Sequence, residues 1–276
     1  MISRFAKALL TTTFLLGGAS AAQAAAGFIA LEGSDATALH HDSSYTAQLF
    51  KYLQGPSVLP VLVYNPAGVI DLSAINGGVA TVNKTSLAGL TLSDYSAIYI
   101  ESAGGCCTAD ITALDGFGAA VTAFIAAGGN LSIENYIGGG YDGVVPGGGI
   151  PPATMPAGVV EGFTALNGGV GGGPGCTDRE TVNANGLARG FTQPAVLGCW
   201  THQAYQNSYW LPLGYISLID SDPAYVFGDG SHIGSSFLAF GGTLGAPTGV
   251  PEPLTLSLFS AGLVGAYAMR RKAKKA

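Results

Sequence analysis

Charged residues are scarce in this chain. They make up 10% of its 276 residues, whereas about a quarter is usual in soluble proteins. Basic residues are the rarer sign, since eleven Lys and Arg face seventeen Asp and Glu. Seven of the basic residues lie near the chain ends, so residues 25–249 keep four basic and sixteen acidic residues, a net charge of −12. Nucleic acid and anionic lipid are poor partners for such a surface, and cations or neutral polysaccharide are better ones.

Phosphate-binding loops and the usual metal-binding spacings are missing as well. The chain has 43 glycines, but runs such as Gly104-Gly105 lack the spacing of a phosphate-binding loop and are followed by no lysine. No C-x-x-C pair occurs, which weakens the case for a zinc site made of all four cysteines. Because 48% of the residues are apolar, the glycines indicate long ordered loops rather than disorder.

The N-terminal end has the pattern of a secretory signal peptide. Met1 to Ala24 starts with basic residues and continues with a mostly apolar run from Ala8 to Leu16. It ends in Ala22-Gln23-Ala24, which fits an A-x-A cleavage site. The apolar run is too short for a membrane anchor. We therefore expect cleavage by signal peptidase and export of the chain.

The C-terminal end carries three features in a fixed order. They are Val250-Pro251-Glu252-Pro253, the mostly apolar run Leu254 to Met269, and a basic end that includes Arg270 and Arg271. This tail resembles the PEP-CTERM sorting tail of Gram-negative bacteria. The resemblance implies an exosortase-type sorting enzyme as partner, cleavage at the Pro-Glu-Pro motif, a transient stay in the inner membrane, and delivery to the cell surface or the exopolysaccharide matrix. An ordinary tail anchor is the alternative, although sixteen residues are few for a full crossing.

Between these ends, residues 27–240 are expected to form a single α/β domain. Short apolar runs alternate with helical patterns, as in a parallel sheet that helices cover on both faces. The segment 69–93 is left open between short strands and helical turns. The expected elements are strands at 28–32, 58–64, 97–101 and 130–134, a helix capped by Ser43 or Ser44, and a helix over 109–127 that Thr108 caps and Gly128 ends.

The order of elements from Gly27 to Glu134 resembles the flavodoxin-like sheet of the class I glutamine amidotransferase-like proteins. The runs at 94–100 and 128–131 carry the resemblance. That family places its nucleophile in a Gly-x-Cys-x-Gly turn after a strand, whereas here the strand at 131–134 is followed by Asn135-Tyr136-Ile137. The resemblance therefore implies a fold and not amidotransferase activity.

The second half of the domain is expected to be more irregular. A glycine-rich insertion at 138–175 predicts a surface excursion, after which the core resumes. Strands are predicted at 195–200 and 215–219, and an antiparallel hairpin is predicted between 225–227 and 236–240. Residues 241–249 would then link the domain to the sorting tail.

Four cysteines in an exported chain favour two disulfides. A bridge between the neighbours Cys106 and Cys107 would need Cα atoms closer than disulfides usually have. Each is therefore expected to pair with Cys176 or Cys199, in either order. A reactive thiol at the start of the helix expected over 109–127 is the alternative.

Three expected strands each end in a glutamate, at Glu32, Glu101 and Glu134. The carboxyl ends of parallel strands share one edge, the edge where α/β proteins bind ligands. Repulsion between the carboxylates would be relieved by a divalent cation such as calcium, by raised pKa values, or by capping interactions of each glutamate. The same groups could instead act as acid and base in glycoside or ester hydrolysis. Further groups expected near this edge are Asp35, His40, His41, Asp42 and His202.

The stretch from Trp200 to Tyr215 is rich in aromatic and amide side chains. This composition suits stacking on sugar rings, and core packing is the alternative. The leading hypothesis is a non-enzymatic surface or matrix protein that binds polysaccharide. The second hypothesis is an extracytoplasmic hydrolase that uses Glu32, Glu101, Glu134 and His202.

Overall fold

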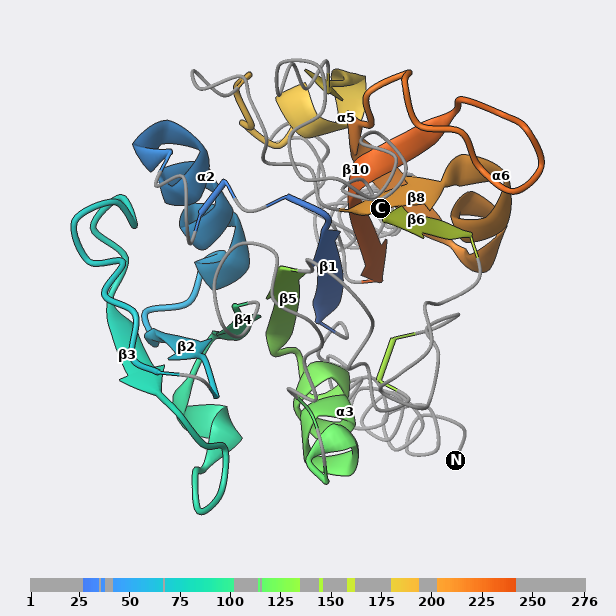
Figure 1. The fold of residues 1–276 in the computed structure, drawn as a ribbon. Coiled ribbons are helices and arrows are strands. Elements are labelled where there is room, and N and C mark those ends of the chain that lie inside the picture. Colours follow the sequence, from blue (N-terminus) through green and yellow to red (C-terminus); the bar gives the residue numbers. More distant parts are fainter. Residues whose placement is uncertain are drawn as a thin grey trace, which may run out of the picture. The chain divides into compact units, whose positions relative to one another are not determined.

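The signal segment, the four cysteines, His202 and the sorting tail lie outside the described residues, so the hypotheses on them stay predictions. Within the described part, no helix is both long and apolar enough to cross a membrane. The computed structural model (Figure 1) describes residues 27–34, 36–37, 42–66, 68–101, 114, 116–134, 144–145, 158–161, 180–193 and 203–241.

Five neighbouring strands form the parallel half of a mixed sheet, in the order β3-β2-β4-β5-β1. The side chains of β1, β2 and β4 are buried on both faces, which explains why these strands are continuous apolar runs. At the centre, Leu131 lies opposite Ile29 on one side and Ile98 on the other. The five strands are β1 (Phe28–Glu32), β2 (Val61–Tyr64), β3 (Thr81–Lys84), β4 (Ala97–Ile100) and β5 (Asn130–Glu134).

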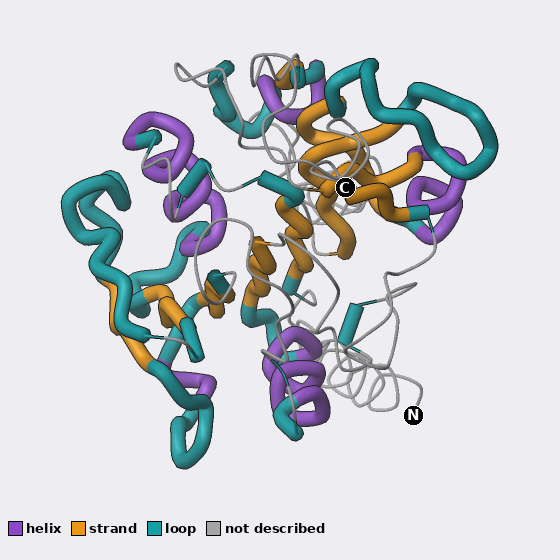
Figure 2. The backbone as a smooth tube through the Cα atoms, viewed as in Figure 1, coloured by secondary structure: helices purple, strands orange, loops and turns teal. Residues whose placement is uncertain are grey.

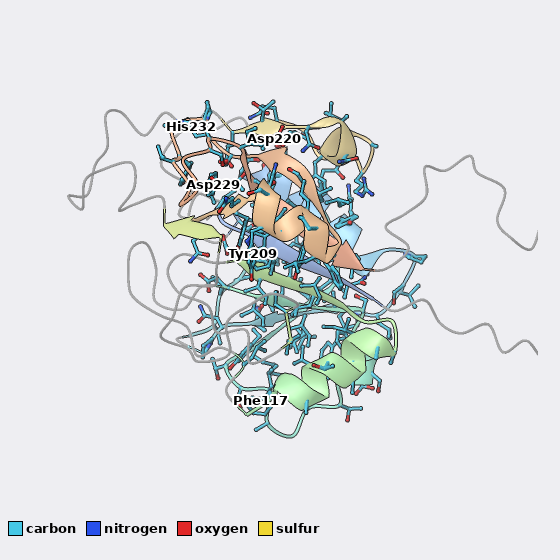
Figure 3. The ribbon with its side chains drawn as sticks, turned by 90° about the vertical axis from the view of Figure 1, so that its right-hand side faces the viewer. Phe117, Tyr209, Asp220, Asp229 and His232 are labelled. Carbon is cyan, nitrogen blue, oxygen red and sulfur yellow. The ribbon has the colours of Figure 1, made fainter. Side chains whose placement is uncertain are left out.

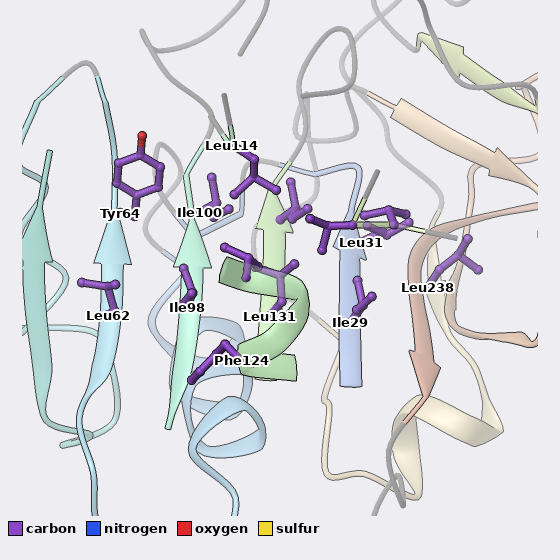
Figure 4. Close-up of a cluster of buried hydrophobic side chains, with 14 of the residues drawn as sticks. Ile29, Leu31, Leu62, Tyr64, Ile98, Ile100, Leu114, Phe124, Leu131 and Leu238 are labelled. Atoms are coloured by element: carbon purple, nitrogen blue, oxygen red, sulfur yellow. The ribbon is translucent and has the colours of Figure 1, made fainter. Parts of the chain in front are cut away.

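The two longer helices, α2 (Ser43–Gln54) and α3 (Gly118–Ala126), cover opposite faces of this parallel half. The connection through α2 leads from β1 across two strands to β2, and the connection through α3 leads back from β4 towards β1. Because such crossovers are right-handed, the reversal of direction moves the helix to the other face. Figure 2 shows the central strands between the two helices, and Figure 4 shows Phe124 of α3 in front of Ile98 and Leu131.

The start of α2 differs from the sequence prediction. Asp42, and not Ser43 or Ser44, caps the helix, because its Oδ1 accepts hydrogen bonds from the backbone N–H groups of Ser44 and Tyr45 at 3.0 and 2.9 Å. A carboxylate is well suited to this position, since it also interacts favourably with the positive end of the helix dipole. The helix ends at Gly55, which has a φ of 55°.

The start of α3 also differs from the prediction, which placed the helix over 109–127. The described helix begins at Gly118. Gly116 just before it has a φ of 75°, a left-handed conformation that a continuous right-handed helix does not contain. Gly128 has a φ of 101° and terminates the helix as predicted. Thr108 lies outside the described residues.

On the other side of β1 the sheet becomes antiparallel. Strand β10 (Gly234–Gly241) pairs with β1 from Phe28 opposite Gly241 to Glu32 opposite Phe237. The predicted hairpin has the wrong first strand, because β10 pairs with β9 (Tyr215–Asp220). Residues 225–227 belong to no strand, and Phe227 N–H donates to the carbonyl of Ser231 across the turn at 228–229. The remaining elements are β6 (Val159–Glu161), β7 (Thr181–Val182), β8 (Gln203–Gln206), α5 (Ala184–Leu187), α6 (Asn207–Trp210), η1 (Leu92–Asp94) and η2 (Leu211–Leu213).

Two further expectations are corrected by the strand pairing. β6 lies inside the segment 138–175, which was expected to be a surface excursion, yet it pairs with β8 in the sheet. The strand expected over 58–64 begins only after Pro60, and this strand, β2, lies between β3 and β4. Pro60 has no N–H to donate, but its carbonyl accepts the backbone N–H of Ser96 at 2.9 Å, so the proline is tolerated directly before the strand.

The expected α/β class, with a parallel sheet and helices on its faces, is confirmed. The layout is compatible with a flavodoxin-like one. The strand order differs from the 2-1-3-4-5 order of flavodoxin in the place of the first strand, because β1 is the last of the parallel strands, at the border with the antiparallel half, and does not lie between two other parallel strands.

Candidate functional site

Glu32, Glu134 and Glu101 lie in one row across three neighbouring parallel strands. Glu32 is the register partner of Glu134. Glu101 directly follows Ile100, whose partner Ile133 directly precedes Glu134. The row is at the carboxyl edge of the sheet, on the α2 face. The three side chains are 1%, 0% and 4% exposed, so their carboxylates are inside the domain.

The carboxylate of Glu32 accepts two hydrogen bonds from hydroxyl groups. Tyr45, in the first turn of α2, donates to Oε2 at 2.9 Å. Ser132, two residues before Glu134 on β5, donates to Oε1. Residues two apart on a strand share a face, so the sheet itself places Ser132 beside the carboxylates. The burial of Glu32 is therefore compensated by two donors.

The other two glutamates are held in a similar way. The hydroxyl of Tyr99 on β4 donates to Oε2 of Glu134, and the amide Nδ2 of Asn65 after β2 donates to Oε2 of Glu101. Tyr99 also packs against Phe50 of α2, with ring centroids 5.3 Å apart. The row is thus tied to both the neighbouring strands and the covering helix.

Burial dominates the electrostatics of this row. It raises the pKa of Glu32 from 4.5 to about 7, although the hydrogen bonds from Ser132 and Tyr45 oppose the change. Burial likewise raises the pKa of Glu101 to about 7, opposed by the Asn65 hydrogen bond. The pKa of the Tyr45 and Tyr99 hydroxyls is raised by burial and by the neighbouring carboxylates. Both tyrosines therefore stay protonated donors at any physiological pH.

Sequence reasoning found the glutamates and missed their surroundings. Ser132 and Tyr99 could have been found from strand alternation, because each lies two residues before a glutamate and so on the same face. Tyr45 reaches Glu32 from α2, a contact between two separate elements that no local sequence pattern indicates. Glu180, which precedes β7 and is buried, gave no local signal, yet its charge contributes to the raised pKa of Tyr45.

A calcium site formed by the whole row finds no support in this geometry. Each carboxylate instead accepts a hydrogen bond within the domain, Glu32 from Tyr45, Glu134 from Tyr99 and Glu101 from Asn65. Among the residues that the structure describes, no three His, Cys, Asp or Glu side chains are grouped so that they could hold a metal ion. Asp42 is the helix cap described above, and Asp35, His40, His41 and His202 lie outside the described residues.

The aromatic stretch expected to stack on sugars is mostly core. Tyr205, Trp210 and Tyr215 are buried, and Trp210 makes edge contacts with the other two at centroid distances of 5.5 and 5.0 Å. Trp210 Nε1 donates to the carbonyl of Gly158 at 3.2 Å. Tyr209 packs against the outside of this cluster (Figure 3). The described part of the stretch therefore follows the core-packing alternative.

A second polar group, around Asp229 and His232, closes a loop (Figure 3). The carboxylate of Asp229 accepts from the backbone N–H of Ser231 at 2.8 Å and from Ser208 Oγ at 3.1 Å, and these bonds lower the pKa of Asp229 to about 2. His232 Nδ1 lies 2.8 Å from the carbonyl of Pro223. These contacts fix the connection between β9 and β10.

The chemistry available at the row is that of two buried carboxyl groups on neighbouring strands, Glu32 and Glu134, of which Glu32 has a pKa raised to about 7. Two carboxyl groups can act as an acid and a base, but only on a substrate that reaches them. No family model, no curated protein and no solved structure matches this chain.

Proposed function

We propose that this chain is an exported protein of a Gram-negative bacterium, sorted and cleaved at its C-terminal tail and delivered to the cell surface or the exopolysaccharide matrix. There its α/β domain binds polysaccharide and does not hydrolyse it. The observation that carries the non-catalytic part is the burial of Glu32, Glu101 and Glu134, each of which accepts a hydrogen bond from a side chain within the domain. A catalytic carboxylate has to contact its substrate, whereas these are engaged inside the fold.

The charge of the body supports a neutral polymer as the ligand. Residues 25–249 carry four basic groups in all, and a polymer rich in uronate or phosphate would meet a net charge of −12. In fold, we propose the flavodoxin-type arrangement of the amidotransferase-like proteins without their nucleophile turn. This layout supplies a rigid support and carries no activity with it.

The sorting half of the proposal is tested by replacing Pro251-Glu252-Pro253 with alanines. We expect the variant to stay in the membrane with its basic tail attached, because the sorting enzyme would lose its recognition motif. The matched control replaces Pro247-Thr248-Gly249, directly upstream in the linker. Membrane fractionation and the mass of the mature protein are the measurements. Unchanged release and mass in the Pro-Glu-Pro variant would overturn the assignment.

A second function, an extracytoplasmic hydrolase, is favoured by one specific observation. Glu32 and Glu134 are register partners, and the pKa of Glu32 is about 7, as suits an acid or base at neutral pH. Retaining glycosidases place their carboxyl groups about 5 Å apart, close to the spacing of adjacent strands. Turnover of glycoside or ester substrates by the wild type, lost in both Glu32→Gln and Glu134→Gln, would replace our first proposal with this one.

A further inference from the structure

A groove of about 750 Å³ lies at the amino edge of the parallel strands, the edge opposite the glutamate row. Three segments line it: 54–59 after α2, 90–96 around η1, and 120–130 from α3 into the start of β5. Its volume falls in the range of about 300 to 1,000 Å³ that is usual for ligand sites. The groove is therefore separate from the carboxyl groups of Glu32, Glu134 and Glu101.

The groove carries no charge on any described residue that lines it. Its polar groups are amides and hydroxyls, such as Gln54, Ser93 and Asn130, and its aromatic side chains are Tyr95 and Phe124. The groove therefore offers no charged partner to a charged ligand, so the cost of removing such a ligand from water would not be offset and an uncharged ligand is favoured.

The walls of the groove are fixed by hydrogen bonds. Asn130 Nδ2 donates to the carbonyl of Leu53 at 2.8 Å, and its Oδ1 accepts the backbone N–H of Phe28 at 3.1 Å. Gln54 Nε2 donates to the carbonyl of Leu59 at 3.1 Å, which closes the turn after α2. A preformed wall lowers the entropy that a ligand has to offset when it binds.

The floor of the groove is apolar and closely packed. A Cβ atom on Gly129 would lie 2.2 Å from the ring of Phe124, so this ring rests directly on the backbone at Gly129. The exposed face of α3 beside it offers only the small side chains Ala120 and Ala123. The result is a shallow apolar surface with amides and hydroxyls at its rim. An uncharged sugar chain complements such a surface, because the C–H faces of its rings can pack on the apolar floor and its hydroxyl groups can bond to the rim.

We propose that this groove binds a segment of a neutral polysaccharide. The inference rests on the proposed function, because it names the binding surface of the same domain. The sugar rings lie over Tyr95 and the alanine face of α3, and their hydroxyl groups bond to the amides and hydroxyls of the rim. We propose the groove as the sugar-binding site instead of the aromatic stretch at 200–215, because the described part of that stretch packs in the core.

The test uses the protein purified from its exporting host and an array of neutral hexose and uronic acid oligosaccharides. Ala123→Trp and Ala120→Trp fill the groove, and Ala119→Trp is the matched control, exposed on the same helix but not lining the groove. Thermal melts of all variants check that the exposed helix positions accept the larger side chain. We expect the wild type and Ala119→Trp to bind neutral oligosaccharides equally, and the groove variants to bind at least about tenfold more weakly.

Two different failures are distinguishable in this experiment. If the wild type binds no neutral oligosaccharide, or prefers uronic acids, both the proposed function and this inference are overturned. If the wild type binds neutral oligosaccharides and the folded groove variants bind equally well, only the groove assignment is overturned. Binding of the apolar dye N-phenylnaphthylamine to the groove, with no sugar binding, would also overturn the inference and identify an apolar ligand instead.

Discussion

Glu32 and Glu134 lie opposite each other on neighbouring parallel strands, both side chains are buried, and Tyr45 of α2 donates a hydrogen bond to Glu32. Burial disfavours the ionised form of Glu32 and raises its pKa from 4.5 to about 7, so this carboxyl group retains its proton well above the usual range for glutamate. The hydroxyl groups of Tyr45 and Ser132 donate hydrogen bonds to Glu32, and the hydroxyl of Tyr99 donates one to Glu134. These bonds offset part of the cost of burying the two carboxylates. The stability of the domain is thereby linked to pH.

The first prediction is a loss of stability as the pH rises. The pKa of Glu32 is about 7 in the folded chain against 4.5 ordinarily, so the folded state binds its proton more tightly between these values. The free energy of unfolding should fall as pH rises from about 4.5 to 7, by on the order of 3 kcal/mol for this group. Glu32→Gln mimics the protonated form and should flatten the dependence. Urea unfolding at pH 5 and pH 8 measures the free energy of unfolding of both proteins. If this free energy changes with pH equally in the wild type and in Glu32→Gln, the raised pKa of Glu32 is contradicted.

The second prediction concerns the donor to Glu134. Tyr99→Phe removes one hydroxyl and leaves the contact with Phe50, so a buried carboxylate loses a hydrogen bond without loss of ring packing. We expect a decrease of roughly 1 to 3 kcal/mol in the free energy of unfolding, because a buried carboxylate loses the donor of one hydrogen bond. Tyr95→Phe, a change of the same size on a half-buried ring, is the control and should lower the free energy of unfolding by less. Equal decreases in the two variants would show that the hydroxyl of Tyr99 contributes no more than a partly exposed one.

The third prediction separates two candidate helix caps. Asp42→Ala removes the acceptor for two backbone N–H groups of α2 and should cost about 1 kcal/mol. Ser43→Ala, one position later and exposed, should change stability by less than about half of that. Chemical denaturation of both variants measures the difference. If Ser43→Ala costs more than Asp42→Ala, the capping assignment is wrong.

The fourth prediction stays with the sequence, because the cysteines lie outside the described residues. Peptide mapping without reductant should find Cys106 and Cys107 bridged to Cys176 and Cys199, in either order. Loops of this length should contribute roughly 3 to 5 kcal/mol by the chain-entropy estimate. Free thiols at Cys106 and Cys107 in protein from its native compartment would rule out the bridges and favour the reactive-thiol alternative.

The sequence predicted four of the five parallel strands, since their signals are local, whereas β3 lies in the segment 69–93 that was left open. Gly128 ends α3 because a left-handed residue is needed there, and short apolar runs mark the buried strands. The antiparallel half was predicted poorly, because β1 and β10 are about 200 residues apart and the sequence of neither strand indicates which strand it pairs with. Gly116 interrupts the expected long helix through its left-handed conformation. The sequence does not show whether a glycine adopts this conformation or a helical one, so the interruption could not be predicted.

The site was predicted in part for a related reason. Three glutamates at strand ends are visible in sequence, and their alignment follows from parallel pairing. Whether such a row is exposed to substrate or buried depends on what lies over it, which here is α2, with Tyr45 supplying the donor. The aromatic residues at 205–215 show the same limit, since identical side chains serve a sugar site or a core and only burial separates the two.

The pairing of β1 with β10 also brings the two ends of the domain together. Phe28 lies opposite Gly241, and a Cβ on Gly241 would lie 3.3 Å from the carbonyl oxygen of Gly27. The first and last described residues of the domain are therefore close together, so the segments that precede and follow the domain are attached to it at neighbouring points. Joining 241 to 27 by a short linker and opening the exposed turn at 77–78 should yield a circular permutant that folds, and the same geometry would let the domain be spliced into a surface loop of another protein.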